Sequence, residues 1–227
     1  MCHVFLMKVL VIAAHMDDEV LGLGGAIAKH VVAGDDVTVC IVCKRAYDHQ
    51  FDDKIIKQEK IAARQAASIL GYRNIHFLDL RDELLDERLS DVIIPLEKCV
   101  FKVEPDVVYT HHRADSNQDH RAVFQASLVT CRAIAQYGVP RLFSYEVPSS
   151  TDQVPPFQEY AFQPNFYVNI TDFLERKIDA MKAYHRELRE FPHPRSAKGI
   201  RVLAEKRGME IGFQAAEAFF LLRDRWA

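Results

Sequence analysis

The sequence lacks the features that mark nucleic-acid-binding, secreted and membrane proteins. Its 29 Lys and Arg residues are outnumbered by 32 Asp and Glu residues, and the net charge is −3. The basic residues form no run, so no nucleic-acid partner is expected. A signal peptide has a basic segment followed by an apolar one, and the N-terminus of this sequence lacks that arrangement. No apolar run is long enough to span a bilayer. We therefore expect a cytoplasmic protein without a membrane span.

The cysteines do not have the spacing that is typical of metal sites or of a set of disulfides. The five cysteines are odd in number, and only Cys40 and Cys43 have C-x-x-C spacing. A second pair is absent, and these two lie in a strand-like run, where residues three apart point to opposite faces. This disfavours a zinc or redox C-x-x-C site and favours reduced cysteines in an intracellular protein.

Internal repeats, low-complexity segments and linkers are also absent. With 227 residues, of which 49% are hydrophobic, the chain is long enough to bury a core without disulfides. We predict a single domain over residues 1–227. A start at Met7 would make residues 1–6 a dispensable extension.

Short apolar runs alternate with amphipathic stretches in the first 140 residues. The predicted strands are 8–12, 37–42, 75–78 and 107–110. The predicted helices are 20–33, 53–70, 89–103 and 121–137, with Pro95 kinking or splitting the third. This alternation predicts an α/β fold, a Rossmann-like three-layer sandwich with a mostly parallel sheet.

The pattern changes beyond Arg141 to a C-terminal β/α extension. Strands are predicted over 142–147 and 165–170, with a Pro-containing loop between them. Thr171-Asp172 is expected to cap a helix that reaches His185, with Glu175 completing a capping box. A further helix is predicted over 197–207.

Polar side chains gather where the predicted strands end. His15, Asp17 and Asp18 follow the first strand, Arg45 follows the second, and a stretch over 111–120 follows the fourth. The carboxyl ends of parallel strands share one edge of the sheet, which is where such folds bind ligands. A simpler interpretation is that Asp17 or Asp18 only caps the next helix, but this leaves the other polar groups without a role.

His15, Asp18 and His120 together make a His-Asp-His set, which suits a catalytic zinc site with three protein ligands and one open position. Asp17 lies beside a ligand and is free to take a proton from water. The spacing supports this division of roles.

Two motifs resemble those of a known family. His15-Met16-Asp17-Asp18-Glu19, followed by Gly22-Leu23-Gly24-Gly25-Ala26-Ile27-Ala28, is similar to the AHPDDE…GxGGTIA signature of the LmbE-like, or PIG-L, zinc-dependent de-N-acetylases. Asn117-Gln118-Asp119-His120-Arg121 resembles the second motif of that family. Weaker similarity continues into the C-terminal part, so the resemblance covers most of the chain.

The resemblance implies a Rossmann-like fold and amide hydrolysis. Carried over by position, it implies His15, Asp18 and His120 as metal ligands and Asp17 as general base. The implied cofactor is Zn²⁺, with Fe²⁺ as the alternative, and the implied substrate is a GlcNAc-type amino sugar or its conjugate. Because related proteins often assemble, a homo-oligomer is also expected, with the loop at 192–196 reaching a neighbouring site.

Two positions depart from the family pattern. Met16 replaces a proline, which removes no functional group. Asn117 stands where the second motif often has a histidine that is proposed as general acid or oxyanion stabiliser. An amide can donate a hydrogen bond to an oxyanion but cannot supply a proton near neutral pH. The acid role is left open among His111, His112 and a protonated Asp17.

Further polar residues are expected to line the site or contact substrate: Arg45, His111, His112, Asp115, Glu146, His193 and Arg195. The alternative for Arg45 is a solvated loop residue, and for the last three a rigid surface turn. Asp119 either orients a metal-binding imidazole or caps the following helix.

Two other functions compete with this interpretation. A nucleotide-binding Rossmann protein is disfavoured, because Gly22–Gly25 matches G-x-G-x-x-G poorly and follows an acidic loop that would repel a pyrophosphate. The alternative from a different class is a catalytically silent carbohydrate-binding or scaffold protein that retains the metal site. Asn117 favours this alternative, and the intact Asp17 is evidence against it.

Overall fold

The computed structural model describes residues 6–226 and confirms the predicted α/β fold. Most of the suggested extension at residues 1–6 lies outside the described part. The strands are β1 Lys8–Ala13, β2 Asp36–Lys44, β3 Asn74–Arg81, β4 Val107–His111, β5 Arg141–Tyr145, β6 Phe166–Asn169 and β7 Ala216–Asp224. The helices are α1 Asp18–Ala33, α2 Asp53–Leu70, α3 Leu89–Val103, α4 Gln118–Thr130, α5 Leu174–Ala183 and α6 Ala197–Met209.

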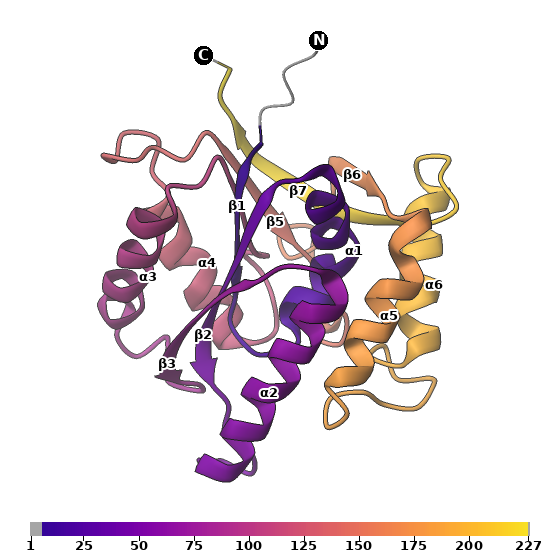
Figure 1. Cartoon of the computed structure of the whole chain (residues 1–227), viewed down its shortest axis with the longest axis horizontal. Helices are drawn as coiled ribbons and strands as arrows, with labels where there is room; N and C mark the ends of the chain where they lie inside the picture. Colours follow the sequence, from indigo (N-terminus) through magenta and orange to yellow (C-terminus); the bar gives the residue numbers. More distant parts are fainter. Residues whose placement is uncertain (1–5, 227) are drawn as a thin grey trace.

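One seven-stranded sheet forms the middle layer, in the order β3-β2-β1-β4-β5-β7-β6. The first five strands in this order are parallel, and β7 runs antiparallel to both β5 and β6. Helices α3 and α4 cover one face, and α1, α2, α5 and α6 cover the other (Figure 1). Alternate residues of β1 enter the two apolar cores, Val9 and Val11 on the α1 side and Leu10 and Ile12 on the α3 side.

Helices with strong end signals have the predicted bounds. The Asp52 side chain accepts hydrogen bonds from the backbone N–H groups of Lys54 and Ile55 at the start of α2, and Gly71 ends it with φ 94°. Both are common terminal signals. Helix α3 also has its predicted bounds and continues through Pro95 without being split.

Helices α1 and α6 differ from the prediction by two residues at one end, and two helices differ more. α4 ends at Thr130 rather than residue 137. Ile134, beyond that end, is 92% exposed, so this apolar residue contributes no packing that would stabilise further turns of helix. The predicted capping box is also wrong: α5 begins at Leu174 after a 3₁₀ turn, Thr171 donates to Asn169, and Glu175 pairs with Arg201.

Strand β7 is not predicted by the sequence pattern. It lies between β5 and β6 and contains the buried Glu217. A buried acid interrupts the alternation that identifies a strand. Among the described residues, no helix combines the length and the hydropathy needed to cross a membrane.

Close packing of α1 against the sheet explains part of its glycine-rich sequence. A Cβ atom on Gly22 would lie 2.3 Å from Cδ2 of Tyr145. Tyr145 cannot move away easily, because it is fully buried and its hydroxyl donates to the carbonyl of Ile12 at 2.8 Å.

We therefore expect Gly22→Ala to lower the free energy of unfolding by about 2–3 kcal/mol, as in other overpacked cores. Gly24→Ala is the comparison, because the nearest atom to its Cβ would be Cγ of the flexible Lys177 side chain, at 3.2 Å, followed by Cγ1 of Val20 at 3.4 Å. Urea unfolding of both variants measures the difference, and an equal loss in the two would contradict the packing argument.

Candidate active site

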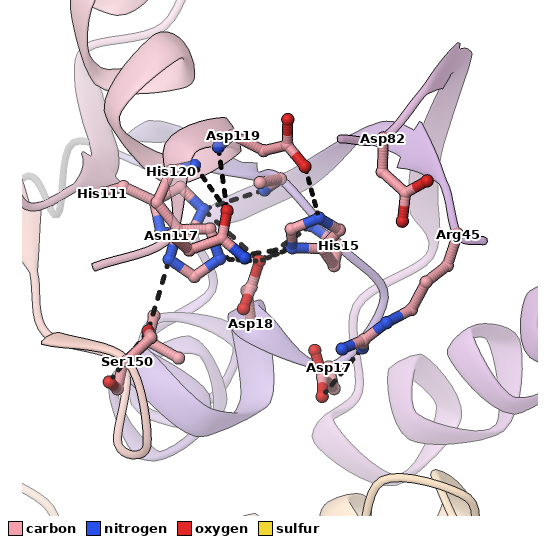
Figure 2. A network of polar contacts seen from close by, with 12 residues as sticks. His15, Asp17, Asp18, Arg45, Asp82, His111, Asn117, Asp119, His120 and Ser150 are labelled. Carbon is pink, nitrogen blue, oxygen red and sulfur yellow. Dashed lines mark hydrogen bonds and ion pairs between the residues drawn. The ribbon is translucent and has the colours of Figure 1, made fainter. Parts of the chain in front are cut away.

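The three predicted loops meet at the carboxyl edge of the sheet because β2, β1 and β4 are neighbours. They line a pocket of about 210 Å³ together with Ser149, Ser150 and Arg195. Figure 2 shows that His15, Asp18 and His120 point toward one another and that Asp17 lies to one side, near Arg45.

His15, Asp18 and His120 form a group that could hold a metal ion. Nδ1 of His15 lies 3.4 Å from Oδ2 of Asp18 and 3.2 Å from Nε2 of His120. Nε2 of His120 lies 3.3 Å from the same carboxylate oxygen. All three side chains are buried, and the backbone N–H of His15 also donates to Asp18 at 2.7 Å.

Each histidine of this group contacts a second carboxylate through its other ring nitrogen. Asp119 lies 3.2 Å from Nε2 of His15, and Asp115 lies 3.2 Å from Nδ1 of His120. Asp119 therefore contacts the remote histidine rather than its neighbour in sequence, and it does not cap α4. Asn117 caps that helix, accepting from the backbone N–H groups of Asp119 and His120.

Asp17 lies in a strained backbone conformation. Its φ is 125°, a region that residues other than glycine rarely adopt. Asp17 holds the N-cap position of α1, but its side chain makes no capping hydrogen bond, so the simple capping interpretation is wrong for this residue. With this backbone conformation, the carboxylates of Asp17 and Asp18 point in different directions (Figure 2).

The carboxylate of Asp17 is buried against two arginines. Its Oδ2 lies 3.3 Å from Nη1 of Arg195 and 3.6 Å from Nη1 of Arg45. Burial raises the pKa of Asp17 to about 7, since the cost of desolvating the charged form exceeds the attraction of the arginines. Such a carboxyl group can both accept and return a proton near neutral pH.

Glu187 is a buried residue of this site that the sequence analysis misses. It accepts a hydrogen bond from Tyr47 at 3.0 Å and one from Arg195 at 2.5 Å, and it lies 3.3 Å from Arg45. It follows α5 in an alternation of Arg and Glu, where no local pattern distinguishes it from surface charges.

His111 lies beside the group but is held in its neutral form. Its Nε2 accepts from the backbone N–H of Ala14 at 2.8 Å, and its ring stacks on that of His120. Burial and the neighbouring His120 lower the pKa of His111 to about 3. A neutral His111 whose Nε2 accepts from Ala14 has no proton on that nitrogen to give to a substrate, which disfavours it as the general acid.

Three other candidates are not among the residues that line the pocket. His112 packs edge-on against Phe162 and lines a different cavity, of about 330 Å³. Glu146 makes a bidentate ion pair with Arg207, with both contacts at 2.7 Å. His193 accepts from the backbone N–H of Arg195 within its own loop.

The four described cysteines, Cys40, Cys43, Cys99 and Cys131, are free. Cys43, without Cys40, lies near His15 and Asp119, with the ligand atoms of these three residues within 4.8 Å of one another. Burial raises the pKa of Cys43 well above its usual value, so it is a thiol in this structure.

Fold and site together define an α/β protein with a buried His-Asp-His group at the carboxyl edge of a parallel sheet. A family described as PIG-L, GlcNAc-PI de-N-acetylase, matches residues 10–131, more than half of the chain. The chain belongs to this family, which places it among the deacetylases, hydrolases that act on amides.

Two curated relatives support this membership. The "uncharacterized deacetylase YaiS" of Escherichia coli is 32% identical over 182 residues, which cover 78% of this chain and 89% of that protein. The diacetylchitobiose deacetylase of Thermococcus kodakarensis is 27% identical over 202 residues, 81% of this chain and 71% of that protein.

Solved structures share the fold at lower identity. The N,N'-diacetylchitobiose deacetylase of Pyrococcus horikoshii has a TM-score of 0.76 and 22% identity, over 95% of this chain and 84% of that chain. The 4-carboxy-2-hydroxymuconate hydratase GalB of Pseudomonas putida has a TM-score of 0.75 and 21% identity, over 97% and 98% of the chains. The fold alone therefore does not determine the reaction.

Glu19 holds the loop that carries Asp17. It is fully buried and accepts from the hydroxyl of Tyr184 at 2.6 Å and from the backbone N–H of Asp17 at 3.1 Å. Burial raises the pKa of Glu19 from 4.5 to about 7. The group therefore favours the folded state most below pH 4.5, and this contribution is lost as the pH rises through 7.

Glu19→Gln removes this titration. Relative to the wild type, its free energy of unfolding should be higher at pH 8 than at pH 5 by about 2–3 kcal/mol, since one pKa unit corresponds to about 1.4 kcal/mol. Urea unfolding of metal-free protein at both pH values measures this. An equal effect at both would show that Glu19 titrates normally.

Proposed function

We propose that the protein is a zinc-dependent hydrolase that removes an acetyl group from an N-acetylated amino sugar of GlcNAc type or from its conjugate. His15, Asp18 and His120 would hold the metal, and Asp17 would act as general base. The observation that carries this proposal is the convergence of these four side chains in one pocket of about 210 Å³.

The ligand spacing fits zinc. Tetrahedral coordination with bonds of about 2.0–2.1 Å separates ligand atoms by roughly 3.3–3.4 Å. The three separations here are 3.2, 3.3 and 3.4 Å. Two imidazoles and one carboxylate also suit Fe²⁺, which is the alternative metal.

Asp115 and Asp119 would fix the histidine tautomers. Each would accept a hydrogen bond from the N–H of the ring nitrogen that faces away from the group, which leaves the other nitrogen free to bind a cation. Asp119 also accepts from the backbone N–H of Glu83 at 2.8 Å, and Asp115 from that of Asn117 at 2.9 Å. Both carboxylates are therefore fixed in place before a metal arrives.

Zinc, when bound, would lower the pKa of the attacking water and polarise the amide carbonyl. Asp17 would take the proton of that water. A nearby dication favours the ionised carboxylate, so Asp17 would be ready to accept a proton at neutral pH. Arg45 and Arg195 would orient this carboxylate and line the pocket toward the substrate.

The general acid would also be Asp17. His111 is neutral and His112 lines another cavity, which leaves the protonated Asp17 to pass its proton to the leaving amine. Asn117 uses its Oδ1 to cap α4, which leaves its amide N–H groups free, and the residue lines the pocket. One of these N–H groups would donate to the oxyanion that develops on the carbonyl.

The substrate class is supported by the family description and by the relative that acts on diacetylchitobiose. The second candidate function, a catalytically silent carbohydrate-binding or scaffold protein, is favoured by Asn117, which cannot replace a protonated histidine.

Metal analysis and acetate release test the proposal together. We expect about one zinc per chain and acetate release from one of a panel of free, nucleotide-linked and lipid-linked N-acetylglucosamine substrates. Zinc without acetate release from any substrate would support the silent alternative. The absence of bound metal after incubation with zinc or iron would contradict both functions.

Asp17→Asn should separate metal binding from catalysis. We expect zinc content to remain at the wild-type level while kcat falls by about 10²–10⁴-fold, the usual contribution of a general base. His120→Ala, the matched variant, should lose zinc as well as activity. Normal turnover by Asp17→Asn would contradict the assignment of the base.

Asp119→Asn should weaken zinc binding by about 10–100-fold, because the amide no longer holds the His15 tautomer as the carboxylate does. Asp82→Asn is the control, since Asp82 is also buried nearby but accepts from the backbone N–H of Ala46 at 2.9 Å. Competition with a chromogenic chelator measures both affinities. Equal affinities in the two variants would exclude a role for Asp119 in orienting His15.

A further inference from the structure

Helix α1 is broken immediately after the turn that carries Asp18. Leu23 has φ −149° and ψ 26°, so α1 consists of two helical pieces that meet at an angle. In a regular helix the N–H of Gly25 would donate to the carbonyl of Leu21. The break leaves buried backbone groups that need other partners.

A buried ion pair from two other elements supplies those partners. Glu217 of β7 accepts from the N–H groups of Gly25 at 2.9 Å and Ala26 at 2.7 Å. Lys177 of α5 donates to the carbonyl of Leu21 at 2.9 Å and to Glu217 at 2.7 Å. Glu217 thus replaces the carbonyl that the N–H of Gly25 has lost, and Lys177 replaces the N–H that the carbonyl of Leu21 has lost.

Both charges are almost completely buried, with 4% of each residue exposed. A buried ion pair of this kind is weak evidence for stability, since apolar residues of similar volume often serve as well. What the pair does more specifically is to bridge the two pieces of α1, and this fixes the angle between the first turn and the rest of the helix.

The first turn is short and carries the site. Its start is closed by the carbonyl of Asp17, which accepts from the N–H groups of Val20 and Leu21 at 3.0 and 2.9 Å. Its end is the carbonyl of Leu21, which Lys177 holds. Any rotation of this turn moves the carboxylate of Asp18 relative to His15 and His120.

We propose that Lys177 and Glu217 are positioning residues that set the direction of this turn and so place Asp18 for metal binding. The inference rests on the proposed metal site but not on the proposed reaction. Neither residue touches the pocket that contains Asp17.

Zinc affinity of the folded, metal-free protein tests this. Lys177→Met should bind zinc about 10–100-fold more weakly than the wild type, the range seen when groups that orient metal ligands are lost. Arg223→Met is the matched control: Arg223 lies on β7 like Glu217 and donates to the backbone carbonyl of Val139 at 2.9 Å, far along the strand. It should lose stability without losing zinc affinity.

Lys177→Met leaves Glu217 buried without a counter-charge, which can prevent folding. The double variant Lys177→Met/Glu217→Gln removes both charges and keeps an acceptor for one N–H of α1. It should fold and still bind zinc at least tenfold more weakly, because nothing then holds the Leu21 carbonyl.

Chelator competition and urea unfolding of each variant separate the outcomes. Wild-type zinc affinity in the Lys177 variants would overturn the inference and leave the proposed function intact. Weakened zinc binding in a protein that releases no acetate would support the inference and contradict the proposed reaction. A wild-type protein that binds no zinc would overturn both.

Discussion

Carboxylates buried together at one edge of the sheet are the constraint on which the structure depends. Asp17, Asp18, Asp115 and Asp119 are each at most 3% exposed. An isolated buried carboxylate costs many kcal/mol, so each one needs partners. Two imidazoles, two guanidinium groups and several backbone N–H groups provide them. A divalent cation between His15, Asp18 and His120 would offset the remaining negative charge.

The loops after the strands supply much of that compensation through the backbone. Asp18 accepts from the N–H of His15, Asp119 from that of Glu83, and Asp115 from that of Asn117. These bonds do not depend on a metal. The site is therefore largely organised by the folded chain, which would reduce the reorganisation that the proposed metal binding and catalysis require.

The sequence predicts the parts of this arrangement that local patterns encode. Short apolar runs are enough for the parallel half of the sheet, helical periodicity with the glycine stop at Gly71 is enough for α2, and periodicity without a glycine stop is enough for α3. The convergence of His15 and Asp18 with His120 follows from sheet topology. Asp119 contacts His15, and Asp115 contacts His120. This pairing could not be predicted, because it depends on the orientation of a loop and of a helix end. Glu187 and the strand β7, which contains Glu217, were missed because a charged residue in a local pattern usually indicates the protein surface. Only the tertiary packing shows that Glu187 and Glu217 are buried.

The C-terminal part of the chain does more than extend the sheet, since it also restrains the loop that carries Asp17 and Asp18. The adjacent Asp17 and Asp18 can serve different partners only because the backbone turns at Asp17 with φ 125°. Such a conformation costs about 1–3 kcal/mol and persists only when the surroundings hold it. Tyr184, at the end of α5, donates to Glu19, which itself accepts from the backbone N–H of Asp17, and Lys177 donates to the carbonyl of Leu21, four residues beyond Asp17. The parallel half of the fold thus provides the side chains that we propose as metal ligands, and contacts from α5 hold the turn that directs Asp17 and Asp18 to different partners.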